Sequence, residues 1–394
     1  MNTGKTRRPM RRIPALLGIL ILMFLTGCGQ GNVPEGSGST GSMEEHRTGS
    51  MELEAATQFS ADYFENGIAV IRIMDGRSYL LLPEGQEIPD WIPSEQLQEM
   101  TIIREPVEPL YLAASSAMDL FRALDALSAV RMTSTAASDW SIPAVRELVE
   151  ADQIHYVGKY RAPDYEALLE EDIRLTIEST MIYHDPEVRE KIESLGIPVL
   201  IERSSYENDP LGRLEWIRLY GLLLGKQEAA DTLYQQQAEK IRAAASDPLA
   251  KPVTAAFFSV NASGMVVVRK PGDYVTRMIE LAGGSYALAD IAVQDQDMTS
   301  TTTVQMEDFY ERAVDADCLL YNSTIEGDLI SLEDLLEKSD VFRDFKAVRE
   351  GNVWCTNKNV FQETTGTAEM IREMHAIFAG TAEESELNYF HKLN

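Results

Sequence analysis

Basic residues, cysteine and histidine are all scarce in this chain of 394 residues. There are 63 Asp and Glu against 35 Lys and Arg, so the formal net charge is −28. Removal of residues 1–27, which hold five basic and no acidic residues, would make the charge −33. This charge argues against a nucleic-acid partner and against adhesion to anionic lipid, since both attract cationic proteins.

The chain also lacks the common motifs of catalysis and metal binding. No GxSxG, HExxH or GxxxxGK[ST] occurs, and no HxxxH or CxxC pair. We therefore predict no catalytic residue, no directly bound metal and no resident cofactor. The five histidines are scattered: His46, His155, His184, His375 and His391. His184 follows an expected strand, where a surface or helix-capping role is favoured over a ligand contact.

Only three cysteines are present. Cys318 and Cys355 each lie in an apolar, strand-like run. A disulfide between them requires neighbouring strands, and two buried free thiols are an equal alternative.

The N-terminus predicts an export signal and a tether. Residues 13–25 are thirteen mostly apolar residues behind a basic segment, and as a helix they would span about 20 Å. That is shorter than a hydrocarbon core of ~30 Å, so a secretory signal over residues 1–27 is favoured over a membrane span. Residues 28–52, rich in Gly, Ser, Thr, Glu and Pro, predict a flexible tether.

The residues at this junction resemble a known processing site. Leu25, Thr26, Gly27 and Cys28 are similar to the bacterial lipobox, in which the cysteine becomes the lipidated first residue of the mature chain. The resemblance implies a lipid anchor at Cys28 on the outer face of the bacterial cytoplasmic membrane. An ordinary secretory signal with a chance cysteine is the alternative.

The remainder predicts an α/β fold of two lobes, each a parallel-type sheet flanked by helices. A first lobe over residues 53–209 contains an antiparallel meander at about 62–83, followed by alternating strands and helices. Residues 210–246 are helix-forming, with Gly221 and Gly225 as break points, and predict a connector, a long, rigid helix between the lobes, whose second part, about 226–245, would span roughly 30 Å. The alternation resumes in a second lobe over residues 247–382, which leaves residues 383–394 as a tail.

Two stretches carry a family resemblance that extends over roughly residues 105–380. "YVGKYRAPDYEALLEEDIRLTIEST" and "TTTVQMEDFYERAVDADCLLYNS" each run from a polar loop through a glutamate and a helix to a strand. Their order and spacing resemble the solute-binding proteins of iron-complex, haem and cobalamin importers, whose two lobes are joined by one long helix. The chain departs from that family at Glu171-Asp172-Ile173, where Lys-Pro-Asp is usual, and in its additional meander.

The resemblance implies a function in uptake. We expect a monomeric, membrane-anchored, extracytoplasmic protein that captures a small-molecule metal complex, first a ferric siderophore-type chelate, and delivers it to an ABC permease and its ATPase. Haem or cobalamin is the alternative ligand. A surface-anchored enzyme such as a tetrapyrrole chelatase is the alternative class.

Ligands of open α/β sheets bind beyond the carboxyl ends of the strands. Lys159, Arg161 and Arg203 are cations at such positions and favour an anionic ligand, although surface ion pairs are the competing interpretation. The other candidates are mostly hydroxyl, amide or aromatic side chains: Ser115, Ser116, Met118, Tyr160, Ser179, Thr180, Tyr206, Asn261, Ser263, Thr301 and Asn322.

Glu166 and Glu307 occupy matching places in the two stretches, each at the start of an expected helix. A carboxylate there interacts favourably with the helix N-terminus, which alone explains both residues. In the family that the chain resembles, glutamates at these positions pair with permease arginines, so the resemblance implies a docking role.

Overall fold

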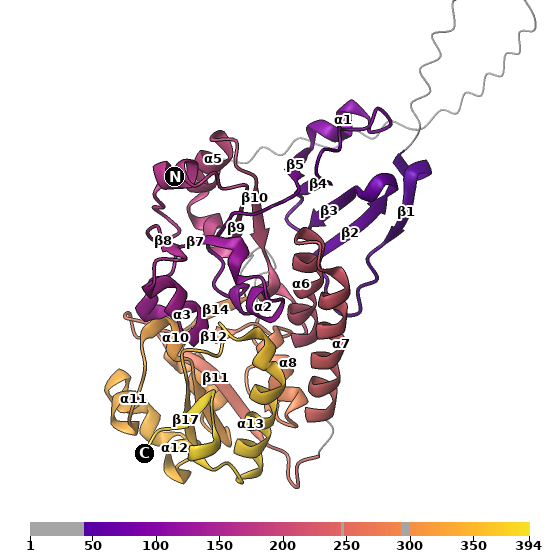
Figure 1. Cartoon of the computed structure of the whole chain (residues 1–394). Coiled ribbons are helices and arrows are strands. Elements are labelled where there is room, and N and C mark those ends of the chain that lie inside the picture. Colours follow the sequence, from indigo (N-terminus) through magenta and orange to yellow (C-terminus); the bar gives the residue numbers. More distant parts are fainter. Residues whose placement is uncertain (1–42, 246–247, 293–299) are drawn as a thin grey trace, which may run out of the picture. The chain divides into compact units, whose positions relative to one another are not determined.

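A computed structural model describes residues 43–245, 248–292 and 300–394 of the chain (Figure 1). The predicted signal segment, Cys28 and most of the predicted tether lie outside these residues. Among the described helices, none is both long enough and apolar enough to cross a membrane. The residues from Gly41 to Asn394 form one compact unit.

A five-stranded sheet precedes the first lobe (Figure 1). Its strands, in spatial order, are β1 (Arg47–Ser50), β2 (Phe59–Phe64), β3 (Ala69–Ile73), β4 (Ser78–Leu82) and β5 (Met100–Arg104). Strands β2 to β4 are the predicted antiparallel meander. Strand β5 adds in parallel to β4 after the short helix α1 (Ser94–Gln98).

The tether is shorter than predicted, because η1 (Met43–His46) and β1 lie in residues assigned to it. Strand β1 pairs with β2, and Arg47 forms an ion pair with Asp62 at 2.6 Å. Met43 is buried in the core of this sheet. One apolar anchor and one ion pair thus order a segment whose composition is that of a linker.

Two buried glutamates fasten residues 54–58 to the rest of the protein. Glu215 accepts the backbone N–H groups of Glu54, Ala55 and Ala56, each at 2.8 Å. Glu207 accepts those of residues 57 and 58, at 2.7 and 3.1 Å. Gly212 permits the approach, since a Cβ there would lie 2.8 Å from the Ala55 carbonyl oxygen. We call residues 54–58 the strap.

The first lobe is built on a parallel sheet, as predicted. The spatial order is β10 (Val199–Glu202), β9 (Leu175–Ser179), β6 (Leu110–Leu112), β7 (Val130–Thr133) and β8 (His155–Tyr156). Its helices are α2 (Met118–Ala123), α3 (Pro143–Glu150), α4 (Tyr165–Glu170) and α5 (Pro186–Ser194). The prediction did not include β7.

The connector is a pair of packed helices, α6 (Pro210–Leu223) and α7 (Gln227–Ala244). The chain turns between them at Gly225, which has φ +65°. Gly221 does not break α6; a Cβ there would lie 2.4 Å from the Ala230 Cβ, so the glycine permits the two helices to touch. Helix α6 is buried on nearly every side and contacts both α2 and α8 (Tyr274–Leu281), one from each lobe.

The second lobe has a mixed sheet of seven strands. The order is β14 (Thr301–Val304), β12 (Val266–Arg269), β11 (Thr254–Val260), β15 (Cys318–Tyr321), β16 (Val353–Thr356) and β17 (Phe390–Lys392), with β13 (Ser285–Tyr286) beside β11. Strands β11, β13, β15 and β16 are parallel, and β12, β14 and β17 are antiparallel additions that the prediction omitted. Besides α8, its helices are α9 (Met306–Ala313), α10 (Ser323–Glu326), α11 (Leu332–Lys338), α12 (Lys346–Glu350) and α13 (Thr367–Ala379).

Residues 383–394, predicted to be a tail, belong to this lobe. Strand β17 lies within them and pairs with β16, and Phe390 is 1% exposed in the core. Burial of one aromatic side chain and a short ladder with β16 hold the C-terminus on the sheet.

Cys318 and Cys355 are two buried free thiols. Strands β15 and β16 are neighbours, but Cys355 pairs with Tyr321, three residues beyond Cys318. Three residues of strand correspond to about 10 Å and to the opposite face of the sheet, which rules out a disulfide.

Candidate functional site

Loops at the carboxyl ends of strands from the two lobes meet each other. Gln362, after β16, donates from its amide nitrogen to the Asp139 carbonyl at 2.8 Å and accepts from the Ser141 backbone N–H at 2.7 Å. Thr364 donates its hydroxyl to the Ser116 carbonyl at 3.1 Å. These contacts place the ends of β6, β7 and β16 face to face, as expected for a ligand site between lobes.

Asp119 strengthens this junction. It is fully buried at the start of α2 and accepts both the backbone N–H and the hydroxyl of Thr365 at 2.7 Å. Arg122 pairs with its other oxygen at 2.6 Å. The sequence analysis missed Asp119 and Gln362, because a single Asp or Gln in a loop carries no local signal of a distant partner.

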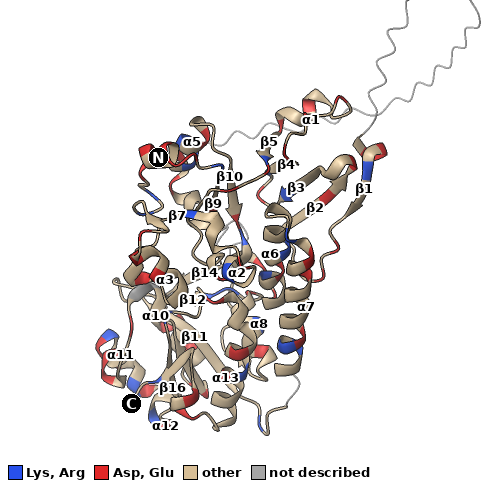
Figure 2. Ribbon diagram, in the orientation of Figure 1, with Lys and Arg blue, Asp and Glu red and all other residues tan. Residues whose placement is uncertain are grey.

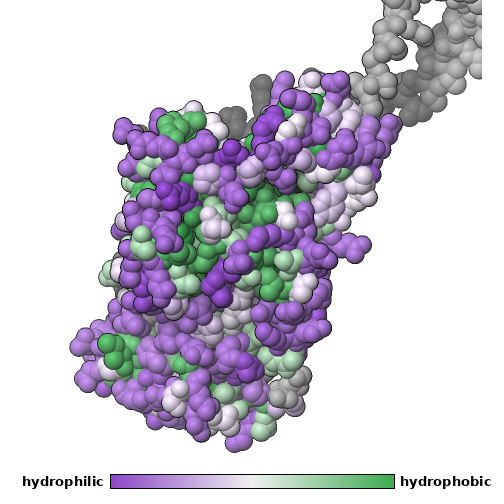
Figure 3. Space-filling model, in the orientation of Figure 1, coloured by the Kyte–Doolittle hydropathy of each residue, from purple (hydrophilic) through white to green (hydrophobic). Residues whose placement is uncertain are grey.

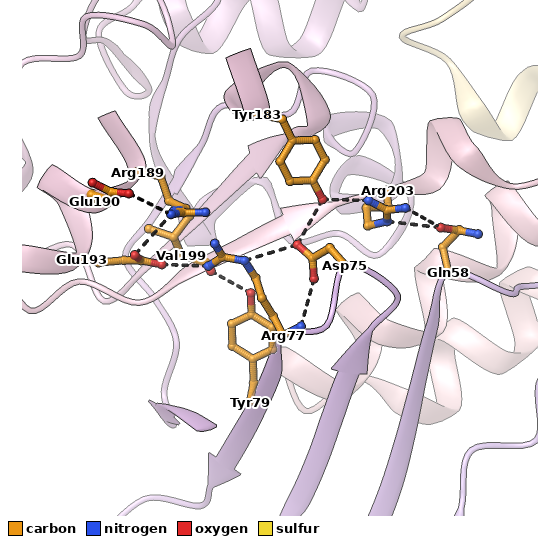
Figure 4. Close-up of polar contacts among 10 residues, drawn as sticks. All are labelled: Gln58, Asp75, Arg77, Tyr79, Tyr183, Arg189, Glu190, Glu193, Val199 and Arg203. Atoms are coloured by element: carbon orange, nitrogen blue, oxygen red, sulfur yellow. Dashed lines mark hydrogen bonds and ion pairs between the residues drawn. The ribbon is translucent and has the colours of Figure 1, made fainter. Parts of the chain in front are cut away.

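Arg203 belongs to an internal network rather than to an open ligand surface (Figure 4). It is 5% exposed and donates to the Gln58 side-chain oxygen at 3.0 and 3.2 Å and to the Tyr183 hydroxyl at 2.8 Å. It also stacks over Tyr206 at 4.7 Å. Three of the five N–H groups of Arg203 are therefore engaged within the protein, and its role as a ligand cation stays a prediction.

The same network connects the N-terminal sheet to the first lobe (Figure 4). The Tyr183 hydroxyl donates to Asp75 at 3.0 Å, and Arg77 pairs with Asp75 and with Glu193 of α5 at 3.2 and 2.8 Å. Burial raises the pKa of Tyr183 to about 12, so its hydroxyl stays protonated and donates. The turn between β3 and β4 is thus fixed beside the loop that follows β9.

Thr180, Ser205 and Tyr206 lie together at the ends of β9 and β10. The Thr180 and Ser205 hydroxyl oxygens are 3.5 Å apart, and Thr180 also hydrogen-bonds to Tyr206. All three are partly exposed. Of the predicted candidates, Thr180 and Tyr206 are therefore adjacent, and Arg203 lies over the Tyr206 ring.

Lys159 and Arg161 are exposed, in the loop after β8. Arg161 donates to the Tyr160 hydroxyl at 2.9 Å and lies 3.9 Å from Asp185. Within the described residues, no partner is found for the Lys159 ammonium group. Lys159 thus remains the predicted cation that is most available to an anionic ligand.

Several other candidates have structural roles. Met118 is fully buried in α2, and Asn322, 5% exposed, caps α10 by accepting from the Thr324 N–H at 3.2 Å. Neither side chain lies on an open surface of this structure, and their roles as ligand contacts stay predictions. The remaining positions stay predictions: Ser115 is partly exposed, Ser179 caps the turn that follows β9, Asn261 and Ser263 form the β11–β12 turn, and Thr301 begins β14.

A buried cationic cluster lies beneath the junction. Arg213 of α6 is 4% exposed and donates to the Tyr274 hydroxyl and to the Phe361 carbonyl, the latter at 2.9 Å. Arg269 stacks on Phe361 at 4.8 Å and pairs with Asp273 at 3.5 Å. Burial raises the pKa of Asp273 despite the positive charge of Arg269. The cluster connects the connector helix α6 to the second lobe.

Glu166 and Glu307 are exposed in the first turns of α4 and α9. Asp164 caps α4 by accepting the N–H groups of Glu166 and Ala167, both at 3.1 Å. The Glu166 carboxylate is therefore not needed as the cap. At α9 the side chain of the N-cap residue Gln305 makes no capping hydrogen bond. The charge of the Glu307 carboxylate therefore still stabilises the N-terminus of this helix.

Acidic residues are spread over the helices of both lobes, with fewer basic residues between them (Figure 2). Hydrophilic residues cover most of the face seen in Figure 3, and hydrophobic ones gather midway along it. The chain thus presents an acidic surface on which exposed cations such as Lys159 are local exceptions.

Comparison with known proteins gives the same architecture. Residues 114–360 match the family described as periplasmic binding protein. The uncharacterized lipoprotein MJ0878 of Methanocaldococcus jannaschii is 22% identical over 321 residues, which are 80% of this chain and 75% of that protein. A second lipoprotein of that organism, MJ0872, is 22% identical over 349 residues, 84% of each chain.

Solved structures share the fold at low identity. A periplasmic binding protein from Veillonella parvula aligns with a TM-score of 0.57 and 13% identity, over 70% of this chain and 92% of that one. A periplasmic heme-binding protein of Vibrio cholerae gives 0.54 and 18%, over 67% and 96%. An Fe3+-hydroxamate transport protein of Saccharomonospora viridis gives 0.53 and 18%, over 68% and 92%. Because the family match covers more than half of the chain and includes strands of both lobes, this protein belongs to the periplasmic binding protein family.

Proposed function

We propose that this protein is an extracytoplasmic solute-binding protein, without enzymatic activity, that takes up a metal complex between its lobes and passes it to an ABC permease and its ATPase. The observation that carries this proposal is the family match over residues 114–360, which covers most of the first lobe, the connector and most of the second lobe. The face-to-face strand ends around Gln362 and Ser116 support it.

We propose a ferric siderophore-type chelate as the first ligand candidate. Thr180, Tyr206 and the exposed Lys159 offer hydroxyl, aromatic and cationic groups to an anionic chelate. Haem is the second candidate, because a heme-binding protein is among the structural neighbours. Cobalamin is the third.

The test begins with the full chain purified in detergent. Its visible absorption spectrum and the mass of any co-purified small molecule are recorded, and the protein is titrated with a ferric hydroxamate, haemin and cyanocobalamin. We expect one of the three to bind, with Lys159→Ala weakening an anionic ligand several-fold and Glu170→Ala, an exposed change in the same lobe, having no such effect. Absence of any chromophore together with failure of all three titrations would contradict the proposal.

We also propose that lipid on Cys28 anchors the protein. The residue lies outside those that the structure describes, and the two relatives named lipoproteins support the proposal. Cys28→Ser should leave the chain either uncleaved or soluble, as measured by membrane fractionation and intact mass. An unchanged acyl mass on the membrane-bound variant would show that the anchor is elsewhere.

A further inference from the structure

Three side chains with metal-binding atoms meet at one edge of the second lobe's sheet. Cys355 on β16 and His391 on β17 are directly paired across the antiparallel strands. Asp328 lies in the loop after α10. The Cys355 sulfur, a carboxylate oxygen of Asp328 and a ring nitrogen of His391 all lie within 4.8 Å of one another. In the part of the chain that the structure describes, no other group of three His, Cys, Asp or Glu residues is this close.

We propose that Asp328, Cys355 and His391 bind a divalent d-block cation of the Zn2+ class. Thiolate and imidazole ligands together select borderline metals, and a carboxylate oxygen completes a set of three protein ligands that zinc accepts. Three protein ligands leave the fourth tetrahedral position to water. Cys355 lies near the carboxyl end of β16 and Asp328 in the loop after α10, at the edge of the sheet that β17 forms. The proposal does not depend on which solute is transported.

The distances are close to those of an occupied site. With zinc bonds of 2.0–2.3 Å, tetrahedral ligand atoms lie about 3.5 Å apart. The Cys355 sulfur is already 3.8 Å from the nearer oxygen of Asp328. Cross-strand partners hold their Cβ atoms only about 5 Å apart, so Cys355 and His391 need small side-chain movements to converge on one ion.

The hydrogen bonds of His391 identify which nitrogen would bind the metal. Its Nδ1 is 2.7 Å from the Asn357 side-chain oxygen, and the Asn357 amide is oriented by donating to the Asn388 carbonyl at 2.8 Å. Its Nε2 is 2.7 Å from the Leu329 carbonyl oxygen. A neutral imidazole has a single N–H and cannot donate in both contacts. If a cation replaces the contact of Nε2 with the Leu329 carbonyl, the proton lies on Nδ1 and Nδ1–H donates to the Asn357 side-chain oxygen. Metal-binding histidines usually make such an orienting hydrogen bond.

The Cys355 sulfur is buried, and its thiol lies 3.8 Å from an Asp328 oxygen and 3.7 Å from the Thr356 carbonyl oxygen, both of which are acceptors. Binding of a cation would release the thiol proton to solvent, and the Leu329 backbone N–H is placed to donate to the resulting thiolate. Asp328 is exposed, so an ion can enter from solvent on that side. Occupancy would join the edge strand β17 to the loop after α10, two segments that lie about 60 residues apart in the sequence.

The test uses the full chain in detergent with Cys28 replaced by serine, so that Cys318 and Cys355 are the remaining thiols. The protein is stripped with a chelator and titrated with Co2+, whose thiolate complex has a charge-transfer absorption band. We expect one Co2+ per chain with this band, displaced by Zn2+. Cys355→Ser should abolish the band and Asp328→Asn should weaken binding at least tenfold, whereas the controls Cys318→Ser and His375→Gln should retain both.

Absence of the band at saturating Co2+, or its persistence in Cys355→Ser, would overturn the proposal. If circular dichroism shows that Cys355→Ser is unfolded, Asp328→Asn decides the question, because its exposed side chain can be changed without disturbing the core. Unchanged Co2+ affinity in that variant would equally overturn the proposal.

Discussion

Glu178 is a buried carboxyl group on β9 in the first lobe's sheet. Its side chain is fully buried, and neither of its oxygens has a hydrogen-bond partner among the described residues. The hydroxyls of Tyr111 and Thr176, which face each other across β6 and β9, are also without partners there. Burial raises the pKa of Glu178 from 4.5 to about 8, so the group is largely protonated at neutral pH.

This raised pKa gives stability a defined pH dependence. Below about pH 4.5 the Glu178 carboxyl is protonated in both the folded and the unfolded chain, so it adds no pH dependence to the free energy of unfolding. Between about pH 4.5 and 8 only the unfolded chain releases the proton, so unfolding becomes easier by about 1.4 kcal/mol per pH unit. Glu178→Gln should remove this loss, and its stability relative to the unmodified protein should rise from pH 5 to 8 in chemical denaturation.

The matched control is Glu170→Gln, an exposed change in the same lobe. It should follow the unmodified protein across the pH series. Parallel curves for Glu178→Gln and the unmodified protein would mean that Glu178 ionises in the folded state.

Residues that act locally were the most predictable from the sequence. The positions of Lys159, Thr180 and Tyr206, exposed or partly exposed, follow from strand ends alone. The engagement of Arg203 could not be predicted, because its partner Gln58 lies 145 residues away in the strap, outside the resemblance. The same holds for the Cys355–His391 pair, which is created by the pairing of β16 with a strand in the predicted tail.

At the scale of elements, most helices, the antiparallel meander and most parallel strands were predicted, and several other strands were not. Strands β7, β13 and β17 have two to four residues, at most two periods of alternation, which is a weak signal. Strands β12 and β14 were missed because the alternation of strands and helices favours parallel pairing. The two helices of the connector were predicted with a break at Gly225, where φ is positive.

The strap gives a prediction at this scale. Glu215, fully buried in α6, is the acceptor for three backbone N–H groups of the strap, and Arg218 pairs with it at 2.9 Å. Glu215→Gln places an amide donor against these donors and should lower the free energy of unfolding by about 3 kcal/mol. It should also speed proteolysis within residues 51–58.

Glu228→Gln, an exposed change on α7, is the control and should alter neither measurement. If Glu215→Gln matches the unmodified protein in both denaturation and cleavage rate, the strap is held by its other contacts, such as those with Glu207.

At the scale of the whole molecule, the junction of the lobes is already rich in fixed contacts. Helix α6 contacts both lobes, Arg213 binds Tyr274 and Phe361, and Gln362 bridges to residues 139 and 141. Wide hinge bending would break these bonds. Small-angle scattering with and without whichever chelate binds in the titrations should therefore show nearly equal radii of gyration. A marked compaction would contradict the rigid-connector prediction.

Glu166 and Glu307 carry a second prediction at this scale, which rests on the proposed function. They are exposed on α4 and α9, one in each lobe, and Asp164 already supplies the cap of α4. Carboxylates on two related lobes suit a permease with two-fold symmetry and one arginine site per subunit. Glu166→Ala with Glu307→Ala should leave folding and chelate affinity unchanged and reduce cellular uptake several-fold, and arginine at both positions should reduce uptake further.

The control for docking is a double variant on the same two helices. Glu170→Ala with Glu311→Ala removes equal charge from exposed positions of α4 and α9, so it separates docking from a general loss of surface charge. Asp308, beside Glu307, can take over part of the role of Glu307. We therefore expect the variant that lacks Glu166 and Glu307 to keep some uptake, and the triple variant with Asp308→Ala to take up less. Normal uptake by the triple variant would contradict docking and leave the carboxylates with only their electrostatic effect on the helix N-termini. Loss of chelate binding in the purified double variant would instead place Glu166 and Glu307 in the ligand site.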